Sequence, residues 1–76
     1  QKVYISNAIN RYAADKNLLP QSLNDLVMAD YILADTLAPA DGYCFSASVN
    51  LTNETVDVSY GKNTEISCNS IDYLGD

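Results

Sequence analysis

The chain has 76 residues, of which 47% are hydrophobic, and its ten acidic and four basic residues give a formal net charge of −6. This length and composition suit one globular domain, which we expect to cover residues 1–76. The charge argues against a nucleic-acid-binding protein, because phosphate contacts need clustered basic side chains. The basic residues are instead spread along the chain, at Lys2, Arg11, Lys16 and Lys62.

An amphipathic helix is predicted at the beginning of the chain. Apolar residues recur there at the i, i+3, i+4, i+7 and i+8 spacing of one helix face, which we expect to pack against the rest of the domain. This face consists of Ile5, Ala8, Ile9, Tyr12 and Ala13. Pro20 lacks a backbone N–H and excludes the helical region for the residue before it, so the helix must end before Pro20.

Val3 and Tyr4 lie off this face on a helical wheel. Apolar residues on the outer side of a surface helix suggest a second packing partner, which we expect these two side chains to contact. The predicted helix also begins with the chain itself, without a capping residue before it. We therefore expect it to be the lower part of a longer helix.

A second helix is predicted from Ser22 to about Ile32. Ser22 is a typical N-cap residue, and Asp25, three positions later, gives a weaker form of the capping box. The inner side of this helix is expected to hold Leu23, Leu26, Val27 and Tyr31, with Met28 as a further candidate. With it, the helical part of the domain is expected to cover residues 1–33.

Residues 42–69 are expected to form the β-rich part of the domain. Apolar and polar residues alternate from Tyr43 to Leu51 and from Thr55 to Tyr60, which is the pattern of a half-buried strand. A turn at Gly61–Asn63 and a short third strand, Thr64–Cys68, are predicted to follow. Strands this close in sequence favour an antiparallel meander. The predicted fold class is therefore α+β, with two helices packed on a small antiparallel sheet of about three strands.

Cys44 and Cys68 are the two cysteines of a chain that has no histidine. They are too few for a zinc site, which needs about four nitrogen or sulfur ligands, and they do not form a redox-active C-x-x-C pair. We expect one structural disulfide, closing a loop of about 25 residues in an oxidising compartment. Two free buried thiols in a cytosolic protein are the alternative. Because Cys44 falls on the polar face of its strand, a bulge or a place just outside the strand is expected to bring it to Cys68.

Residues typical of catalysis are scarce. Without histidine, no serine or cysteine has the base that usually activates it, and the carboxylates are scattered, so we expect neither an enzyme nor a cofactor. The acidic segments 35–41 and 72–76 lack the spacing of a calcium loop, so no metal site is expected. Asn50-Leu51-Thr52 and Asn53-Glu54-Thr55 both match the N-glycosylation sequon. An ordinary polar turn is the simpler explanation of these residues.

The stretch from Ala8 to Val27 resembles a segment common in type IV pilins and in the pseudopilins of type II secretion systems. In that family a helix with an A-I-x-x-Y pattern is followed by a short polar stretch, a proline and S-L-x-x-L. The matching residues here are Ala8, Ile9, Tyr12, Asp15, Pro20, Ser22, Leu23 and Leu26. The resemblance covers the helical part of the chain, and beyond it the expected architecture and the cysteine pair agree.

The resemblance implies a subunit that polymerises through packed N-terminal helices, with its globular heads forming the filament surface. The expected partners are copies of this chain and other pilins, and Val3 and Tyr4 become candidate filament contacts. A hydrophobic part of the helix, carrying a glutamate near its start, is expected to precede Gln1 and to anchor the subunit in the inner membrane before assembly. The calcium ligands of the major pseudopilin have no counterpart here, which favours a pilin.

The function implied is that of a major or minor pilin in a filament at the bacterial cell surface, acting in adhesion, motility or DNA uptake. A pseudopilin of a type II secretion system, which forms a short periplasmic filament, is the main alternative. A minor pilin that binds DNA or a surface is a third interpretation, although the net charge of −6 disfavours DNA. A free-standing secreted α+β domain, such as an inhibitor, is the fourth.

Overall fold

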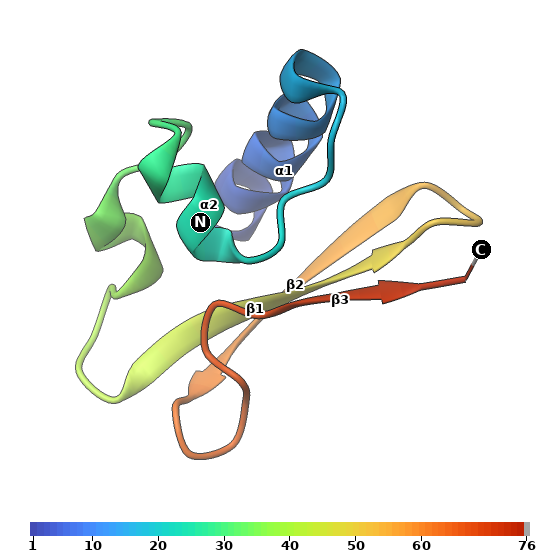
Figure 1. Cartoon of the computed structure of the whole chain (residues 1–76). Helices are drawn as coiled ribbons and strands as arrows, with labels where there is room; N and C mark the ends of the chain where they lie inside the picture. The colour runs from blue at the N-terminus through green and yellow to red at the C-terminus, as the bar shows by residue number, and fades with distance from the viewer. Residues whose placement is uncertain (76) are drawn as a thin grey trace.

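Helix α1 spans Lys2–Lys16 in the computed structural model, which describes residues 1–75 (Figure 1). The buried side of α1 is the predicted apolar face. Its buried members are Ile5, Ala8, Ile9 and Tyr12. Ala13, at the edge of the same face, is only half-buried.

Helix α1 ends at Asn17, which takes the left-handed conformation with a φ of 53°. Asparagine adopts this conformation more readily than most residues, and it stops the helical hydrogen bonds. The helix therefore ends before Pro20, as the sequence predicts.

The second helix is shorter than predicted: α2 spans Leu23–Met28 and does not reach Ile32. Asp30 takes the left-handed conformation with a φ of 64°. The backbone N–H groups of Asp30 and Tyr31 then bond to carbonyl groups in the last turn of α2, which is the pattern of a Schellman motif. Glycine is the usual residue at this position, so an aspartate gives no sequence signal for the end of the helix.

The predicted capping box at the start of α2 is wrong. Ser22 lies at the N-cap position, but its side chain makes no capping hydrogen bond. Asp25 instead accepts a hydrogen bond of 2.8 Å from the backbone N–H of Gln21. The backbone of Ser22 pairs with Ser70 in an isolated antiparallel bridge, so a contact distant in sequence fixes the start of α2. A short 3₁₀ helix, η1 (Ala34–Leu37), follows α2.

Strands β1 (Tyr43–Asn50) and β2 (Thr55–Lys62) form an antiparallel hairpin, which confirms the predicted alternation in this part of the chain. Each residue of β1 has a partner in β2, from Tyr43 opposite Lys62 to Asn50 opposite Thr55. Phe45, Ala47 and Val49 are buried on one face of β1. The hairpin thus gives the helices an apolar face to pack against.

The third strand is misplaced in the sequence prediction. Thr64–Cys68 is a turn and loop, and β3 is Ile71–Leu74. β3 pairs with β1 in parallel, and the strand order is β2-β1-β3. The α+β class is confirmed, but the sheet is mixed and is not an antiparallel meander.

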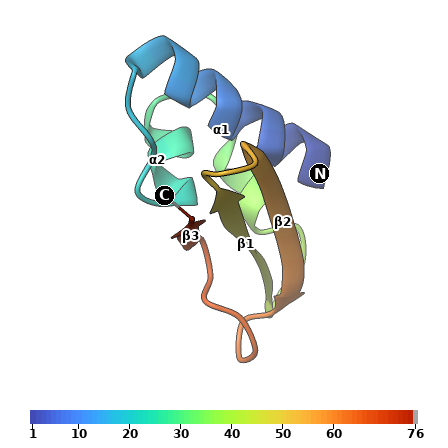
Figure 2. The ribbon, with the colours of Figure 1, turned by 90° about the vertical axis from the view of Figure 1, so that its right-hand side faces the viewer.

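A crossing loop, residues 63–70, explains why β3 lies beside β1 rather than beside β2. The loop leaves the end of β2 and passes on the side of the molecule opposite α1 (Figures 1 and 2). Ile66 covers Gly61 there, since its Cγ2 would lie 3.4 Å from a Cβ at that position. Strand alternation places Cys44, the partner of Gly61, on this same outer face.

A disulfide joins Cys44 of β1 to Cys68 of the crossing loop. Cys44 is buried, whereas Cys68 is exposed. The expected bulge in β1 is wrong, because the pairing with β2 is uninterrupted from Tyr43 to Asn50. It is Cys68 that lies outside a strand, and the loop carries it to the outer face of β1.

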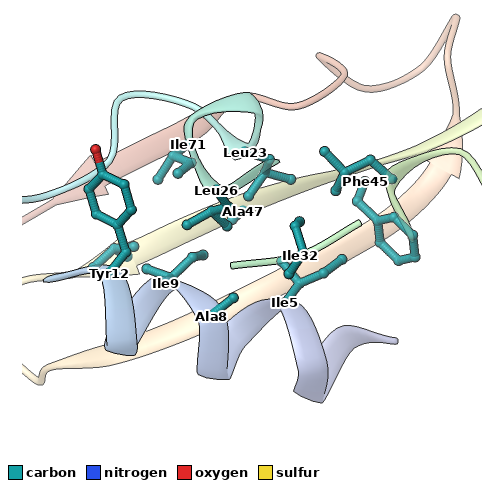
Figure 3. Close-up of a cluster of buried hydrophobic side chains, with 12 residues drawn as sticks. Ile5, Ala8, Ile9, Tyr12, Leu23, Leu26, Ile32, Phe45, Ala47 and Ile71 are labelled. Carbon is teal, nitrogen blue, oxygen red and sulfur yellow. The ribbon is translucent and has the colours of Figure 1, made fainter. Parts of the chain in front are cut away.

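The core lies between the helices and the inner face of the sheet (Figure 3). Helix α1 supplies its apolar face, and Leu23 and Leu26 of α2 are completely buried against it. The remaining buried members of the cluster are Ile32, Leu37, Phe45, Ala47, Val49 and Ile71. The two helices therefore share one core with all three strands.

Replacing Cys44 and Cys68 together by alanine is expected to destabilise the protein strongly. The disulfide spans a sequence separation of 24, and in the chain-entropy model a loop of this size contributes about 3.5 kcal/mol. For a domain this small, the melting temperature should fall by more than about 10 °C, measured by circular dichroism. A melting curve that is unchanged in the double variant and under reductant would show that the crossing loop is held without the disulfide.

Leu26→Ala is expected to lower the free energy of unfolding by about 2–5 kcal/mol, because it leaves a cavity in the core. Met28→Ala is the matched control in the same helix, since Met28 is 82% exposed. The control should change stability by less than about 0.5 kcal/mol. Urea denaturation compares the two, and equal effects would contradict the placement of the inner face of α2.

Candidate interaction surface

Val3 is 73% exposed and lies at the side of α1 that borders β2. A shallow groove between the two elements is lined by Lys2, Val3, Ser6, Val56, Asp57 and Val58. Val56 and Val58 are half-buried in its floor, and a lysine and an aspartate flank it. Because β2 is also an edge strand, this side of the molecule offers a groove of mixed polar and apolar lining next to unpaired strand backbone.

Tyr4, the other candidate filament contact, is 44% exposed and lies on a different side of α1. It borders a shallow hollow on the helix surface together with Asn7, Asn10 and Arg11. The structure therefore does not bring Val3 and Tyr4 into one patch. The first turn of α1 therefore exposes apolar groups on two neighbouring sides of the helix.

Sequence reasoning missed an aromatic groove near the start of α1. Tyr43 and Tyr60 fall on the apolar face of the predicted strands, but they are 39% and 42% exposed. Their rings stack with centroids 5.4 Å apart, and Phe45 packs against Tyr60 at 4.9 Å. The groove beside them is lined by Gln1, Lys2, Pro39, Phe45 and Tyr60.

The aromatic groove adjoins the Val3 groove, because Lys2 lines both of them. Together they form one surface along the first turns of α1 and residues 56–60 of β2, which we call the α1–β2 surface. It is apolar and aromatic at the Tyr60 end and more polar beside Val3. Patches of apolar and aromatic side chains of this kind mark contact sites for other proteins more often than catalytic sites. The apolar and aromatic residues of this surface can bury an apolar partner.

Polar contacts hold the end of α1 in place. The Tyr31 hydroxyl donates a hydrogen bond of 2.8 Å to Asp15, and Arg11 donates one of 3.3 Å to the backbone carbonyl of Tyr31. The hydrogen bond to Asp15 is the main cause that raises the pKa of Tyr31. Because Tyr31 directly follows the left-handed turn that ends α2, these bonds fix α1 relative to α2.

Tyr73 makes the corresponding connection from β3. Its hydroxyl donates a hydrogen bond to the carbonyl of Pro20, in the connection between the two helices. Burial is the main cause that raises the pKa of Tyr73. The last strand is therefore tied to the helical layer as well as to β1.

Within residues 1–75, no three or more histidine, cysteine, aspartate or glutamate side chains are grouped to hold a metal ion. The segment 72–76, considered for calcium, is described only as far as Gly75, and Asp76 lies outside the described residues. Over the same part of the chain, no helix has both the length and the apolar character needed to cross a membrane.

Comparison with protein-family models, with curated proteins and with solved structures finds no match for this chain.

Tyr73→Phe is expected to make the stability of the protein less sensitive to alkaline pH. Because the pKa of Tyr73 is raised above the usual 10.0, the folded state keeps this proton to a higher pH than the unfolded state does. The contribution of Tyr73 to the free energy of unfolding is fully present below pH 10.0. It is lost as the pH rises through the pKa of Tyr73 in the folded state. The free energy of unfolding should therefore decrease from about pH 9 to about pH 11, and less steeply in the variant.

Urea denaturation at the two pH values measures this difference. Tyr4→Phe, which removes a phenol from the surface of α1, is the matched control. An equally steep loss of stability in the wild type and in Tyr73→Phe would show that the half-buried phenol of Tyr73 does not contribute to the alkaline transition.

Proposed function

We propose that this protein is a structural subunit of a type IV pilus-like filament. The observation that carries the proposal is the arrangement of α1, which buries one face in the core while Val3 and Tyr4 remain exposed on its other sides. A helix that packs on a small sheet, with apolar side chains left over in its first turn, suits a subunit whose helices pack against those of its neighbours. The partners are then copies of this chain and other pilins.

The resemblance of residues 8–27 to pilins and pseudopilins supports the proposal from the sequence. In this proposal, α1 continues a hydrophobic helix that anchors the subunit in the inner membrane before assembly. The filament then extends from the cell surface and acts in adhesion, motility or DNA uptake. The proposal depends on the packing of α1 against the sheet, and the parallel position of β3 does not affect it.

The disulfide supports assembly outside the cytoplasm. Disulfides persist in oxidising compartments, such as the periplasm and the cell surface. In a domain of 76 residues, the Cys44–Cys68 bond also supplies stability that a small core cannot provide alone. Both points suit a subunit exposed on a filament.

Replacing Val3 and Tyr4 together by serine is expected to abolish filaments without unfolding the head. Both side chains are exposed in the isolated subunit, so the variant should accumulate normally. Surface filaments of the source cells are counted by electron microscopy, and the subunit level is followed by immunoblot. Met28→Ser is the matched control, because Met28 is the most exposed of the large apolar side chains and lies on α2.

The phenotype separates the candidate assemblies. Loss of filaments in the double variant, with filaments retained in Met28→Ser, supports the proposed pilin. Filaments of normal number and length in the double variant would contradict the role of the first turn of α1. Loss of protein secretion with unchanged pili would instead assign the subunit to the pseudopilin filament of a secretion system.

A further inference from the structure

We propose that Asn53 is an acceptor site for N-linked glycosylation. Asn53 lies in the turn, residues 51–54, that joins β1 to β2 at the tip of the hairpin (Figure 1). The tip carries two adjoining sequons, 50–52 and 53–55. The structure distinguishes between them.

The second sequon is open to an enzyme along its whole length. Asn53, Glu54 and Thr55 are all exposed. The hydrogen bond of Asn53 within residues 1–75 is made by its backbone N–H, which donates to Asn50 Oδ1 at 2.9 Å. Its side-chain carboxamide is therefore directed to solvent without a competing partner in the described part of the chain.

The first sequon is blocked at its acceptor residue. Asn50 is half-buried at the end of β1, where it pairs with Thr55 on one side and with Leu74 on the other. Its Oδ1 accepts the hydrogen bond from Asn53 and so holds the turn. A transferase would have to break this bond and open the end of the sheet to reach the carboxamide of Asn50.

The hydroxyl residue of the first sequon, Thr52, is exposed but crowded on one side. A Cβ added at Gly75 would lie only 2.5 Å from Thr52 Oγ1, so Thr52 packs closely against the C-terminal segment. Recognition of a sequon requires both the asparagine and the hydroxyl residue two positions later. The asparagine of 50–52 is half-buried and hydrogen-bonded, whereas both recognised residues of 53–55 are exposed.

The backbone of the tip also suits binding in an enzyme cleft. Glu54, between the two recognised residues, has a φ of 56°, so the chain turns sharply within the second sequon. Thr55 is the first residue of β2, and its pairing with Asn50 is the last one of the hairpin. Only this end pair has to open for Thr55 to be bound, and ends of hairpins open at low free-energy cost.

The donor we propose is an oligosaccharide carried on a polyprenyl pyrophosphate, because the disulfide indicates an oxidising compartment outside the cytoplasm. The carboxamide nitrogen of Asn53 attacks the anomeric carbon of the first sugar, and a C–N bond forms. The C–O bond to the pyrophosphate breaks, and polyprenyl pyrophosphate leaves. The amide proton passes to a base of the transferase, so the step needs no oxidant or reductant.

The site is compatible with the proposed filament but does not depend on it. β2 runs from Thr55 at the tip to Lys62 near the aromatic groove, so Asn53 lies beyond the end of the strand that is distant from Tyr60. A glycan at the tip would leave the aromatic groove uncovered. It would also shield an exposed turn from proteases.

The test uses the folded, disulfide-bonded chain with a single-subunit oligosaccharyltransferase that accepts N-x-S/T and a polyprenyl-pyrophosphate-linked oligosaccharide. Wild type, Asn53→Gln and Asn50→Gln are compared by intact mass, and a synthetic peptide of residues 46–57 serves as the acceptor without a fold. One glycan is expected on the wild type and on Asn50→Gln, and none on Asn53→Gln. The intact mass of the protein from its own cells is expected to show the same single modification.

Three results would overturn the proposal. One is a glycan on folded Asn53→Gln, which would place the modification at Asn50. Another is an unmodified folded wild type, whether or not the peptide is modified. The last is a protein from its own cells with the mass of the bare chain, which would show that the exposed sequon is not used. None of these results bears on filament assembly, which the Val3 and Tyr4 variants test separately.

Discussion

The disulfide between Cys44 and Cys68 holds the crossing loop against the outer face of β1, and much of the remaining structure follows from that position. The loop delivers Ser70 to its bridge with Ser22 and the carbonyl of Asn69 to the backbone N–H of Leu23, which begins α2. It also sets β3 parallel to β1. A bond on one side of the sheet thus anchors the loop that contacts the start of α2 on the other side.

The periodicity of apolar residues was sufficient to predict the helix and the strands that bury one face. The apolar face of α1 and the alternation along residues 43–51 and 55–60 predict α1 and the β1–β2 hairpin, because burial of one face is a local pattern in the sequence. The turn predicted at Gly61–Asn63 begins too early, since β2 continues to Lys62. The end of α2 and the place of β3 could not be predicted in this way. Asp30 ends α2 without the usual glycine, and Ile71–Leu74 is too short to show a period and becomes a strand by pairing with β1.

The candidate interaction surface was also predicted only in part, because a local sequence pattern does not show how the elements pack. A helical wheel shows that Val3 and Tyr4 lie off the buried face, and both are exposed. It cannot show that they lie on two separate sides of α1. Tyr43 and Tyr60 belong to the inner face of the hairpin, as the alternation predicts, but they lie near the end of the sheet where α1 begins. Coverage by a helix depends on how it crosses the sheet, which is a property of the packed layers and not of the strand sequence.

The two proposed roles, contact between subunits and glycosylation, lie at opposite ends of β2. The side chains at each end explain this division. Near Lys62 the strand lies beside stacked tyrosines and the first turn of α1, where contact with another subunit would remove apolar surface from water. At Thr55 the strand meets a turn of exposed polar residues, which have little to gain from burial because each would need a new hydrogen-bond partner. The aromatic end is therefore the better place for the proposed subunit contact, and the tip is the better place for the proposed glycan. The same hairpin can then contribute to packing between subunits and present a modified surface to solvent.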